Sequence, residues 1–471
     1  MSKSPTNRIN LISDIEVRNT IDKAELSLIE CYDILKYFKS PNETDLKALI
    51  FDFQPKLAEC LYSLMVFYQK LHQKEKNLIS NKHSFVDTDF RQHMKTNAAY
   101  KRAISEVIKM GKALGDAFAW FFFCDNREEL EKHIQHKSTG LFTNGIGGLG
   151  EVEFIKNHQV INGLLVIYHG ITNMLKIGDF SLYAYNKGIV GNGELKTKKE
   201  NDTLVINASI LTKIPPINLS QSKGITSQEI EREFPRLKKQ LQQQTALLKT
   251  QKNPNTLNGL SDYEYSIVNK LCGEQILVFN EDYTLALVAI RNQGCSLSDR
   301  LLCNQDTTVD FNTEIKEIFN RLLDSQSENN CMITGYLDTV PSNARIPIFW
   351  WDIDDDLCKS LYFNAIVILT VFNPARLLSL FEKDGYTVNN GTIPSETHLT
   401  KVEDKTKLEL HNMEMIYNLI SQNLMKTNDA FEFIRNFLEL RKTGEIPLNS
   451  QVEMHISLHN FGTPPTNNNK K

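Results

Sequence analysis

Two short segments decide how this 471-residue chain is interpreted: Ile177-Gly178-Asp179 and Gly193-Glu194-Leu195-Lys196. Each lies in a run of residues that has the pattern of a strand. Residues 176–185 alternate between apolar and polar side chains, and residues 189–199 form a second extended run interrupted by glycines. Because the residues between the two runs are typical of a turn, we predict a hairpin that brings Asp179 beside Glu194 and Lys196.

The three side chains of this hairpin suit metal-assisted hydrolysis. Glu194 and Lys196 are two residues apart, so in a strand both side chains point to the same face. Asp179 and Glu194 would then converge as ligands of a hard divalent cation, Mg²⁺ or Mn²⁺, which prefers carboxylate oxygens. The metal would polarise a water molecule and a phosphate, and Lys196 would stabilise negative charge in the transition state. We predict Asp179, Glu194 and Lys196 as catalytic residues.

Glycines surround the two acids. Gly178, Gly191 and Gly193 have no side chain and would allow a metal ion and a DNA backbone to approach closely. Gly191 or Gly193 is also expected to mark a bulge that changes the direction of Glu194.

The elements on either side of the hairpin have a definite predicted order. Residues 151–175 carry an apolar stripe and are expected to form a helix, and residues 203–210 have the pattern of a third strand. Residues 227–251 are expected to form a long polar helix rich in Gln and Lys, and residues 275–291 further strands. The predicted order is therefore helix, three strands and helix.

This order and these motifs resemble the PD-(D/E)XK superfamily of nucleases, which has the restriction-endonuclease-like fold. Asp179 matches the motif Asp, although it follows Gly rather than Pro, and Glu194 with Lys196 matches the E-x-K pair. The resemblance implies a further acid on the preceding helix, matched by Glu151 or Glu153, as a ligand or as a supporting residue. The residues that it places near the site or the phosphates, on the later helix, are Lys239, Gln240 and Gln244.

The resemblance implies an α/β protein whose core, residues 140–292, is a three-layer mixed sheet. It implies a metal-dependent nuclease that hydrolyses phosphodiester bonds of DNA, and a microbial defence effector against phage or foreign DNA is the role that we expect. Lys198 belongs to a group of basic residues that would follow a phosphate backbone. The alternative is a catalytically inactive nuclease-like scaffold that binds nucleic acid or a protein partner. A surface hairpin with a weak exposed Glu–Lys pair is the plainest interpretation of the motif.

The remaining parts of the chain contain no motif with recognisable chemistry. Residues 1–130 are expected to form a helical domain, with helices over 15–38, 43–73 and 90–123. Homo-oligomerisation, binding of a protein partner and sensing are the roles open to it. Residues 293–460 are expected to form an accessory α+β region and residues 461–471 a disordered tail.

Composition excludes several classes of protein. Apolar residues make up 41% and charged residues 23% of the chain, as in a soluble globular protein. The eight cysteines are scattered without a Cys-x-x-Cys pair, which indicates a reducing compartment. The most apolar windows are shorter than the roughly 20 residues that span a bilayer. We expect a cytoplasmic protein without membrane contact. The net charge of −4 gives no support for nucleic-acid binding, but only the surface that touches phosphate must be positive.

Three further patterns were weighed against simpler explanations. Gly145, Gly147 and Gly150 match a dinucleotide-binding fingerprint, but a helical pattern precedes them, so a hinge into the next helix is expected. The acidic run Asp354–Asp356 is expected to cap a helix rather than bind a metal. His455 and His459 are four residues apart without a third zinc ligand, and a solvated pair is expected.

Overall fold

Helices form the first part of the chain, where apolar residues recur at three- and four-residue spacing. That spacing places them on one side of a helix, and Leu57, Leu61 and Leu64 are accordingly buried. The helices are α1 (Asp14–Leu35), η1 (Lys36–Phe38), α3 (Phe53–Ser80), η2 (Lys82–Ser84), α4 (Asp87–Phe123) and α5 (Arg127–Gln135). They confirm the predicted helical character of this part.

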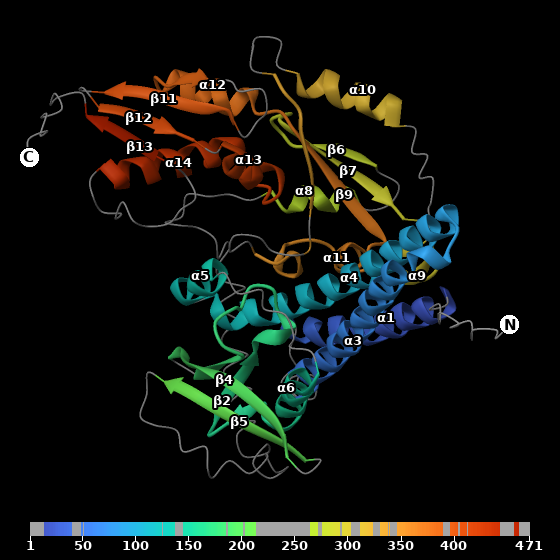
Figure 1. Ribbon diagram of the computed structural model, residues 1–471. Helices are drawn as coiled ribbons and strands as arrows, with labels where there is room; N and C mark the ends of the chain where they lie inside the picture. Colours follow the sequence, from blue (N-terminus) through green and yellow to red (C-terminus); the bar gives the residue numbers. More distant parts are fainter. Residues whose placement is uncertain are drawn as a thin grey trace, which may run out of the picture.

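The structure is a computed structural model. It describes residues 14–39, 49, 51–124, 126–136, 145–184, 187–200, 203–212, 264–271, 276–292, 294–302, 311–323, 330–337, 339, 346–389, 396–403, 406–411, 413–442 and 456–460. In Figure 1 the long helices α1, α3 and α4 form a middle layer. One sheet lies below this layer and the C-terminal helices and strands lie above it.

The lower sheet is an antiparallel meander that follows helix α6 (Ile146–Asn157). Its strands pair in sequence order, with η3 (His169–Ile171) between the second and the third. They are β1 (Val160–Ile161), β2 (Leu164–Tyr168), β3 (Phe180–Ala184), β4 (Gly188–Glu200) and β5 (Thr203–Thr212). The hairpin predicted from the sequence is therefore confirmed as β3–β4.

The helix predicted over residues 151–175 is wrong beyond Asn157. A turn at Asn162 and Gly163, which have φ values of 49° and 77°, folds the chain back so that β1 pairs with β2. Both residue types tolerate this left-handed backbone and favour tight hairpin turns. The aliphatic run that follows, Leu164–Tyr168, is a buried strand, and apolar periodicity alone does not distinguish such a strand from a helix.

The predicted mixed sheet is not what the described strands form. All of their pairings are antiparallel, so the coarse α/β class is confirmed while the sheet type differs from the expectation. The predicted later helix, with Lys239, Gln240 and Gln244, lies outside the described residues.

The C-terminal part contains two more antiparallel sheets, with strand orders β6-β7-β9-β8 and β10-β11-β12-β13. Strand β6 pairs with β7, and β7 pairs with β9 at residues 366–372, so strands from both sides of the boundary predicted at residue 292 share one sheet. The strands are β6 (Leu277–Phe279), β7 (Leu285–Arg291), β8 (Ile333–Tyr336), β9 (Ile366–Phe372), β10 (Thr387–Asn389), β11 (His398–Glu403), β12 (Thr406–Leu410) and β13 (Ile456–Asn460).

Helices cover these two sheets and connect them to the middle layer. They are α8 (Ser266–Asn269), α9 (Leu297–Leu302), α10 (Phe311–Leu322), η5 (Ile348–Trp350), α11 (Asp355–Tyr362), α12 (Ala375–Lys383), α13 (Met413–Ser421) and α14 (Thr427–Lys442). Asp354 caps α11 as predicted, because its carboxylate accepts hydrogen bonds from Asp356 N and Leu357 N at 3.0 Å each.

The helical part does not have a core of its own. One cluster of buried apolar side chains runs from α1 through the lower sheet to the C-terminal helices. Polar contacts follow the same path: Trp350 Nε1 donates to Ala117 O at 2.9 Å, and Arg300 forms an ion pair with Glu25 at 2.5 Å. The lower sheet and the C-terminal part therefore both pack on the same helical layer. Among the described residues, no helix is long and apolar enough to cross a membrane.

Candidate functional site

Asp179 and Glu194 lie opposite each other where β3 and β4 meet. Phe180, the first residue of β3, pairs with Gly193, so Asp179 precedes β3 directly across from Glu194. Asp179 N donates to Gly193 O at 2.8 Å, and Asp179 Oδ2 accepts a hydrogen bond from Leu195 N at 2.6 Å. Pairing between β3 and β4 ends at Phe180 and Gly193, and beyond it the Asp179 side chain, rather than a backbone carbonyl, accepts the hydrogen bond from Leu195 N. We call Asp179, Glu194 and Lys196 the acid corner.

The Asp179 carboxylate is in an unfavourable setting for a negative charge. Burial raises its pKa, the hydrogen bond from Leu195 N lowers it, and the charge of Glu194 raises it again. Within the part of the chain that the structure describes, neither Asp179 nor Glu194 forms an ion pair. The corner therefore holds two adjacent carboxylates that no described cation compensates.

Lys196 shares the face of Glu194, as its position two residues further along β4 requires. Both side chains are exposed, and the same face continues to Lys198. Lys196 pairs with neither acid among the described residues, so its ammonium group is free to meet an anion. The three residues predicted as catalytic are thus brought together at one corner of the sheet.

The two acids predicted on the preceding helix have different positions. Glu151 is buried on α6, where the Tyr168 hydroxyl donates to its carboxylate. The pKa of Tyr168 is raised by burial, by Glu151 and by Asp179, and Tyr168 pairs in the sheet with Phe180, the residue after Asp179. Glu153 instead forms an ion pair with Lys156 at 3.3 Å on another side of α6.

Glu151 is bonded to Tyr168 and is not grouped with Asp179 and Glu194. Among the described residues, no group of three or more His, Cys, Asp or Glu side chains is arranged to hold a metal ion. Two carboxylates are nevertheless a donor set that Mg²⁺ accepts, because this ion keeps several water molecules as ligands.

Two buried histidines, which the sequence did not reveal, hold the segment that leads to Asp179. His133 Nδ1 accepts hydrogen bonds from Lys176 N and Ile177 N, both at 3.1 Å. His169 Nδ1 lies 3.0 Å from Gly178 O, and His169 N donates to Asp179 O at 2.9 Å. Burial lowers the pKa of His133 to about 4 and that of His169 to about 3, so both rings are neutral.

His169 also links this segment to the strands. Its Nε2 lies 2.7 Å from Ser181 Oγ, which lies 2.7 Å from Asn192 Oδ1 on β4. His169 and Ser181 are 3% and 0% exposed, so a substrate cannot reach the pair. This Ser–His contact therefore stabilises the site rather than supplying a nucleophile.

The glycines at the corner are required by protein packing. A Cβ atom at Gly193 would lie 2.1 Å from Phe180 Cζ, and one at Gly178, where φ is 72°, would lie 2.8 Å from Gly193 O. Packing within the protein therefore accounts for both glycines, and the approach of a DNA backbone to them stays a prediction. The expected bulge lies at Val190, next to Gly191, where the register shifts between Leu182 and Tyr183.

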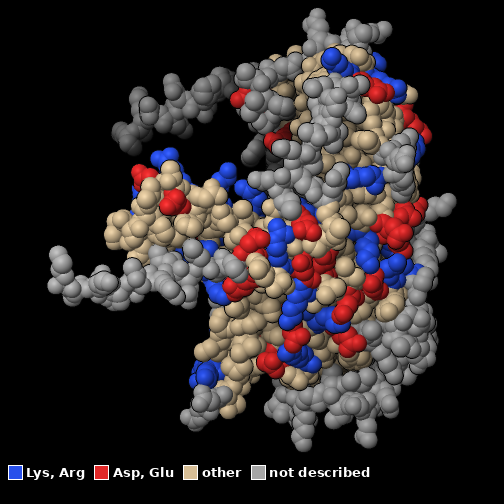
Figure 2. All heavy atoms as spheres, turned by 90° about the vertical axis from the view of Figure 1, so that its right-hand side faces the viewer, with Lys and Arg blue, Asp and Glu red and all other residues tan. Residues whose placement is uncertain are grey.

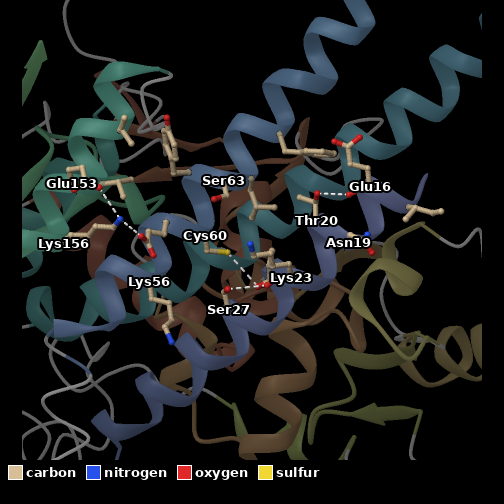
Figure 3. A pocket seen from close by; sticks show the side chains of 18 residues that line it. Glu16, Asn19, Thr20, Lys23, Ser27, Lys56, Cys60, Ser63, Glu153 and Lys156 are labelled. Carbon is tan, nitrogen blue, oxygen red and sulfur yellow. Dashed lines mark hydrogen bonds and ion pairs between the residues drawn. The ribbon is translucent and has the colours of Figure 1, made fainter. Parts of the chain in front are cut away.

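A groove of about 940 Å³ lies on the helical layer, away from the acid corner, and is lined by α1, α3 and α6 (Figure 3). Lysine–carboxylate pairs close its rim: Lys156 pairs with Glu59 and Glu153, and Lys70 pairs with Glu16. Burial raises the pKa of its Cys60 thiol to about 12, so the thiol stays protonated. The groove therefore offers neither an uncompensated acid pair nor a reactive thiolate.

Of the two histidines noted in the sequence, His459 lies in β13 and His455 is outside the described residues, so their arrangement stays a prediction. Lys198 lies in β4 and is exposed, as a phosphate contact requires.

The chain was compared with models of protein families, with curated proteins and with solved structures. None of the three comparisons gave a match.

Proposed function

We propose that this protein is a metal-dependent nuclease that hydrolyses phosphodiester bonds of DNA at the acid corner. The observation that carries the proposal is the pair of adjacent carboxylates, Asp179 and Glu194, that no described cation compensates. Such a pair is stabilised when a divalent cation binds, and its oxygen donors suit Mg²⁺ or Mn²⁺. The resemblance to PD-(D/E)XK nucleases, whose motif residues occupy the same three positions, supports the same conclusion.

Each residue of the acid corner would have a distinct role. Asp179 and Glu194 would hold the metal, with Asp179 oriented by Leu195 N and by the histidine-bound segment behind it. A bound Mg²⁺ would supply polarisation of a water molecule and of the scissile phosphate. Lys196, exposed on the same face, would bind the phosphate and stabilise the negative charge that develops on it.

Glu151 and Tyr168 would support the corner from behind. The Tyr168 hydroxyl donates to Glu151, and its buried ring fixes the strand next to β3. Tyr168 pairs with Phe180 in the sheet, and Phe180 directly follows Asp179, so the Tyr168–Glu151 contact holds the strand next to Asp179 in place.

Cleavage of supercoiled plasmid DNA tests the proposal. Wild-type protein should nick or linearise the plasmid with Mg²⁺ or Mn²⁺ and stop when the metal is chelated. Glu194→Gln and Lys196→Met should lose this activity, and Glu153→Gln should keep it because Glu153 pairs with Lys156 away from the corner. Equal cleavage by wild type and Glu194→Gln would remove the corner from the reaction. DNA binding without cleavage, with every divalent metal, would leave the inactive scaffold as the function.

A further inference from the structure

The chain reaches Asp179 from η3 through a segment that is neither helix nor strand. We call this segment, residues 172–178, the lead-in segment. His133 and His169 bind its second half, as described above. Its first half is bound by a side chain on α4, in the middle layer of Figure 1, and this contact determines where the segment begins its approach to the acid corner.

The side chain on α4 is Asp116, which is fully buried. Its Oδ1 accepts hydrogen bonds from Asn173 N at 2.7 Å and from Met174 N at 3.0 Å. Its Oδ2 accepts a third hydrogen bond, from Asn173 Nδ2 at 2.9 Å. Hydrogen bonds to a charged acceptor are stronger than those between neutral groups, so these contacts attach the start of the lead-in segment firmly to α4.

The surroundings of Asp116 keep its carboxylate charged at neutral pH. Burial raises the pKa of Asp116 to about 6, although the hydrogen bonds from the lead-in segment and the charge of Lys112 lower it. Lys112 is also buried on α4; burial lowers its pKa, and the charges of Asp116 and Glu151 raise it. Above about pH 6 the carboxylate therefore carries no proton and accepts all three hydrogen bonds.

The helix is closely packed on both sides of Asp116 in the sequence. A Cβ atom at Gly115 would lie 1.9 Å from Ile171 O, so α4 contacts the backbone of η3 directly. Ala117 O accepts a hydrogen bond from Trp350 Nε1 at 2.9 Å, which attaches the same turn of α4 to the C-terminal part. Asp116 thus lies where α4 has little room to move.

The lead-in segment can transmit this constraint towards Asp179. Thr172 Oγ1 accepts a hydrogen bond from Leu175 N at 3.1 Å. Together with Asp116 and His133, it provides a side-chain acceptor for every backbone amide of residues 173–177. A displacement at the start of the segment would therefore disturb hydrogen bonds along its length, because buried amides must keep their partners.

We propose that Asp116 is a positioning residue of the acid corner, which fixes Asp179 by binding Asn173 and Met174 to α4. The inference rests on the proposed function in one respect, namely that the position of Asp179 matters for binding a cation together with Glu194. A small divalent cation such as Mg²⁺ demands near-ideal geometry from its ligands, so a displaced Asp179 would bind it more weakly.

Exchanging the acid and the amide between two positions tests the proposal without changing the size of either side chain. In Asp116→Asn, the Oδ1 acceptor remains, but the new amide group faces Asn173 Nδ2, a donor against a donor. In Asn173→Asp, two carboxylates face each other. In the double variant all three hydrogen bonds can form again, with the donor and acceptor side chains exchanged.

Hydrogen–deuterium exchange of the Asp179 amide, which donates to Gly193 O, is a readout that needs no metal. Mass spectrometry at single-residue resolution should show exchange at least about threefold faster in each single variant and wild-type exchange in the double variant. Asn373 N, which donates to Thr284 O in another sheet, should exchange as in wild type throughout. Its exchange would rise as well if the variants only destabilised the whole protein.

Titration of Mn²⁺ is the second readout. Each single variant should bind the ion about 3- to 30-fold more weakly than wild type, and the double variant should recover. Asn280→Asp is the matched control. Asn280 is also buried, and its Oδ1 accepts hydrogen bonds from Thr284 N and Leu285 N in the C-terminal part, so this variant should change neither readout.

The outcomes separate the role of Asp116 from the nuclease. Wild-type exchange at Asp179 in Asp116→Asn, an equal rise at Asn373, or no recovery in the double variant would overturn the positioning role. Cleavage that depends on Glu194 would then still support the nuclease. Faster exchange at Asp179 that the double variant reverses, in a protein that binds no metal, would support the positioning role and reject the cation site.

A milder variant keeps the test decisive if Asp116→Asn does not fold. Asn173→Ala removes only the hydrogen bond from Nδ2 of a half-buried side chain and leaves both backbone amides bound to Asp116. It should raise exchange at the Asp179 amide in the same direction, with Asn373 unchanged, and an unchanged Asp179 amide would overturn the proposal.

Discussion

The acid corner and the groove between α1, α3 and α6 both contain carboxylates, but they balance charge in opposite ways. In the groove, Glu16, Glu59 and Glu153 each pair with a lysine. At the corner, Asp179 and Glu194 face each other, and the neutral Leu195 amide is the hydrogen-bond donor to Asp179. The negative charges of the groove are therefore balanced by lysines. The two carboxylates of the corner have no ion-pair partner among the described residues, so a bound cation would stabilise them.

Charges of both signs are mixed on the surface that Figure 2 presents. Figure 2 shows acidic and basic side chains intermingled across the face that it presents, without a large patch of one sign. Exposed ion pairs of this kind contribute between zero and about 1 kcal/mol each to stability. At the corner, burial and the adjacent charge of the exposed Glu194 both disfavour the charged form of the half-buried Asp179, so a function is more readily assigned to the corner than to the groove.

The largest expected effect comes from replacing one acid by a neutral amide in each region. Glu194→Gln keeps the shape of the side chain but removes a metal ligand, and we expect DNA cleavage to fall at least about 10³-fold. Glu59→Gln, which removes an acid of the groove, should leave the rate unchanged. The comparison fails when both variants lose activity together, or when neither does; initial rates of plasmid nicking decide between these cases.

A smaller effect is expected from the histidines that hold the Asp179 segment. Folded His133 has a pKa of about 4 against an ordinary 6.5, so only the unfolded chain binds a proton between these values. Stability is therefore complete above about pH 6.5 and declines as the pH falls towards 4, by about 3 kcal/mol in total.

His133→Asn keeps an acceptor for the two backbone amides but does not take up this proton. Its urea-unfolding free energy should fall less steeply between about pH 6.5 and 4 than that of wild type, while His83→Asn, an exposed control on η2, should follow wild type. An equally steep decline in His133→Asn would show that this ring does not hold the segment in its neutral form.

Packing at the corner should produce an effect of similar or lower size. In Gly193→Ala the new methyl group would meet the Phe180 ring at 2.1 Å, so β3 and β4 must separate, at a cost of about 1–3 kcal/mol. Gly335→Ala on β8 meets its nearest neighbour at 3.2 Å and should change the unfolding free energy much less. Denaturant midpoints at constant slope measure the difference, and equal midpoints would contradict the close contact between the strands.

The smallest effect is expected in the groove. Lys156→Ala removes two exposed ion pairs, with Glu59 and Glu153, and should lower the free energy of unfolding by less than about 1 kcal/mol. Binding of divalent metal should not change. If Lys156→Ala binds a divalent metal at the groove, any two acids that lose their lysine can form a cation site. The arrangement of Asp179 and Glu194 would then not distinguish the corner from the groove.

The sequence predicts the corner well because its signals are local. Period-two alternation and the two-residue spacing of Glu194 and Lys196 set the strand face, and a turn between the runs places Asp179 across from them. Helix α6 is different: the apolar run after it continues with helical spacing, and only Asn162-Gly163 indicates that β1 and β2 form a hairpin. At this point the Asn-Gly pair predicts the hairpin correctly, whereas the apolar periodicity around it predicts a helix.

The supporting residues depend on contacts between distant parts of the chain. His133 reaches Lys176 across 43 residues, and Gln54 on α3 donates to Val166 O across 112 residues. No local pattern marks either side chain, since a buried histidine and an exposed one look the same in a single sequence. Glu151 was identified as a helix-borne acid, but its partner Tyr168 was expected within a helix and lies in β2.

Metal binding by the unmodified chain tests the central claim most directly. Isothermal titration of Mn²⁺ into wild-type protein should show one saturable site, and the same titration of Asp179→Asn, which can still accept the Leu195 hydrogen bond, should show none. Equal binding by the two proteins, or no binding by wild type, would contradict the claim that the two carboxylates form a cation site.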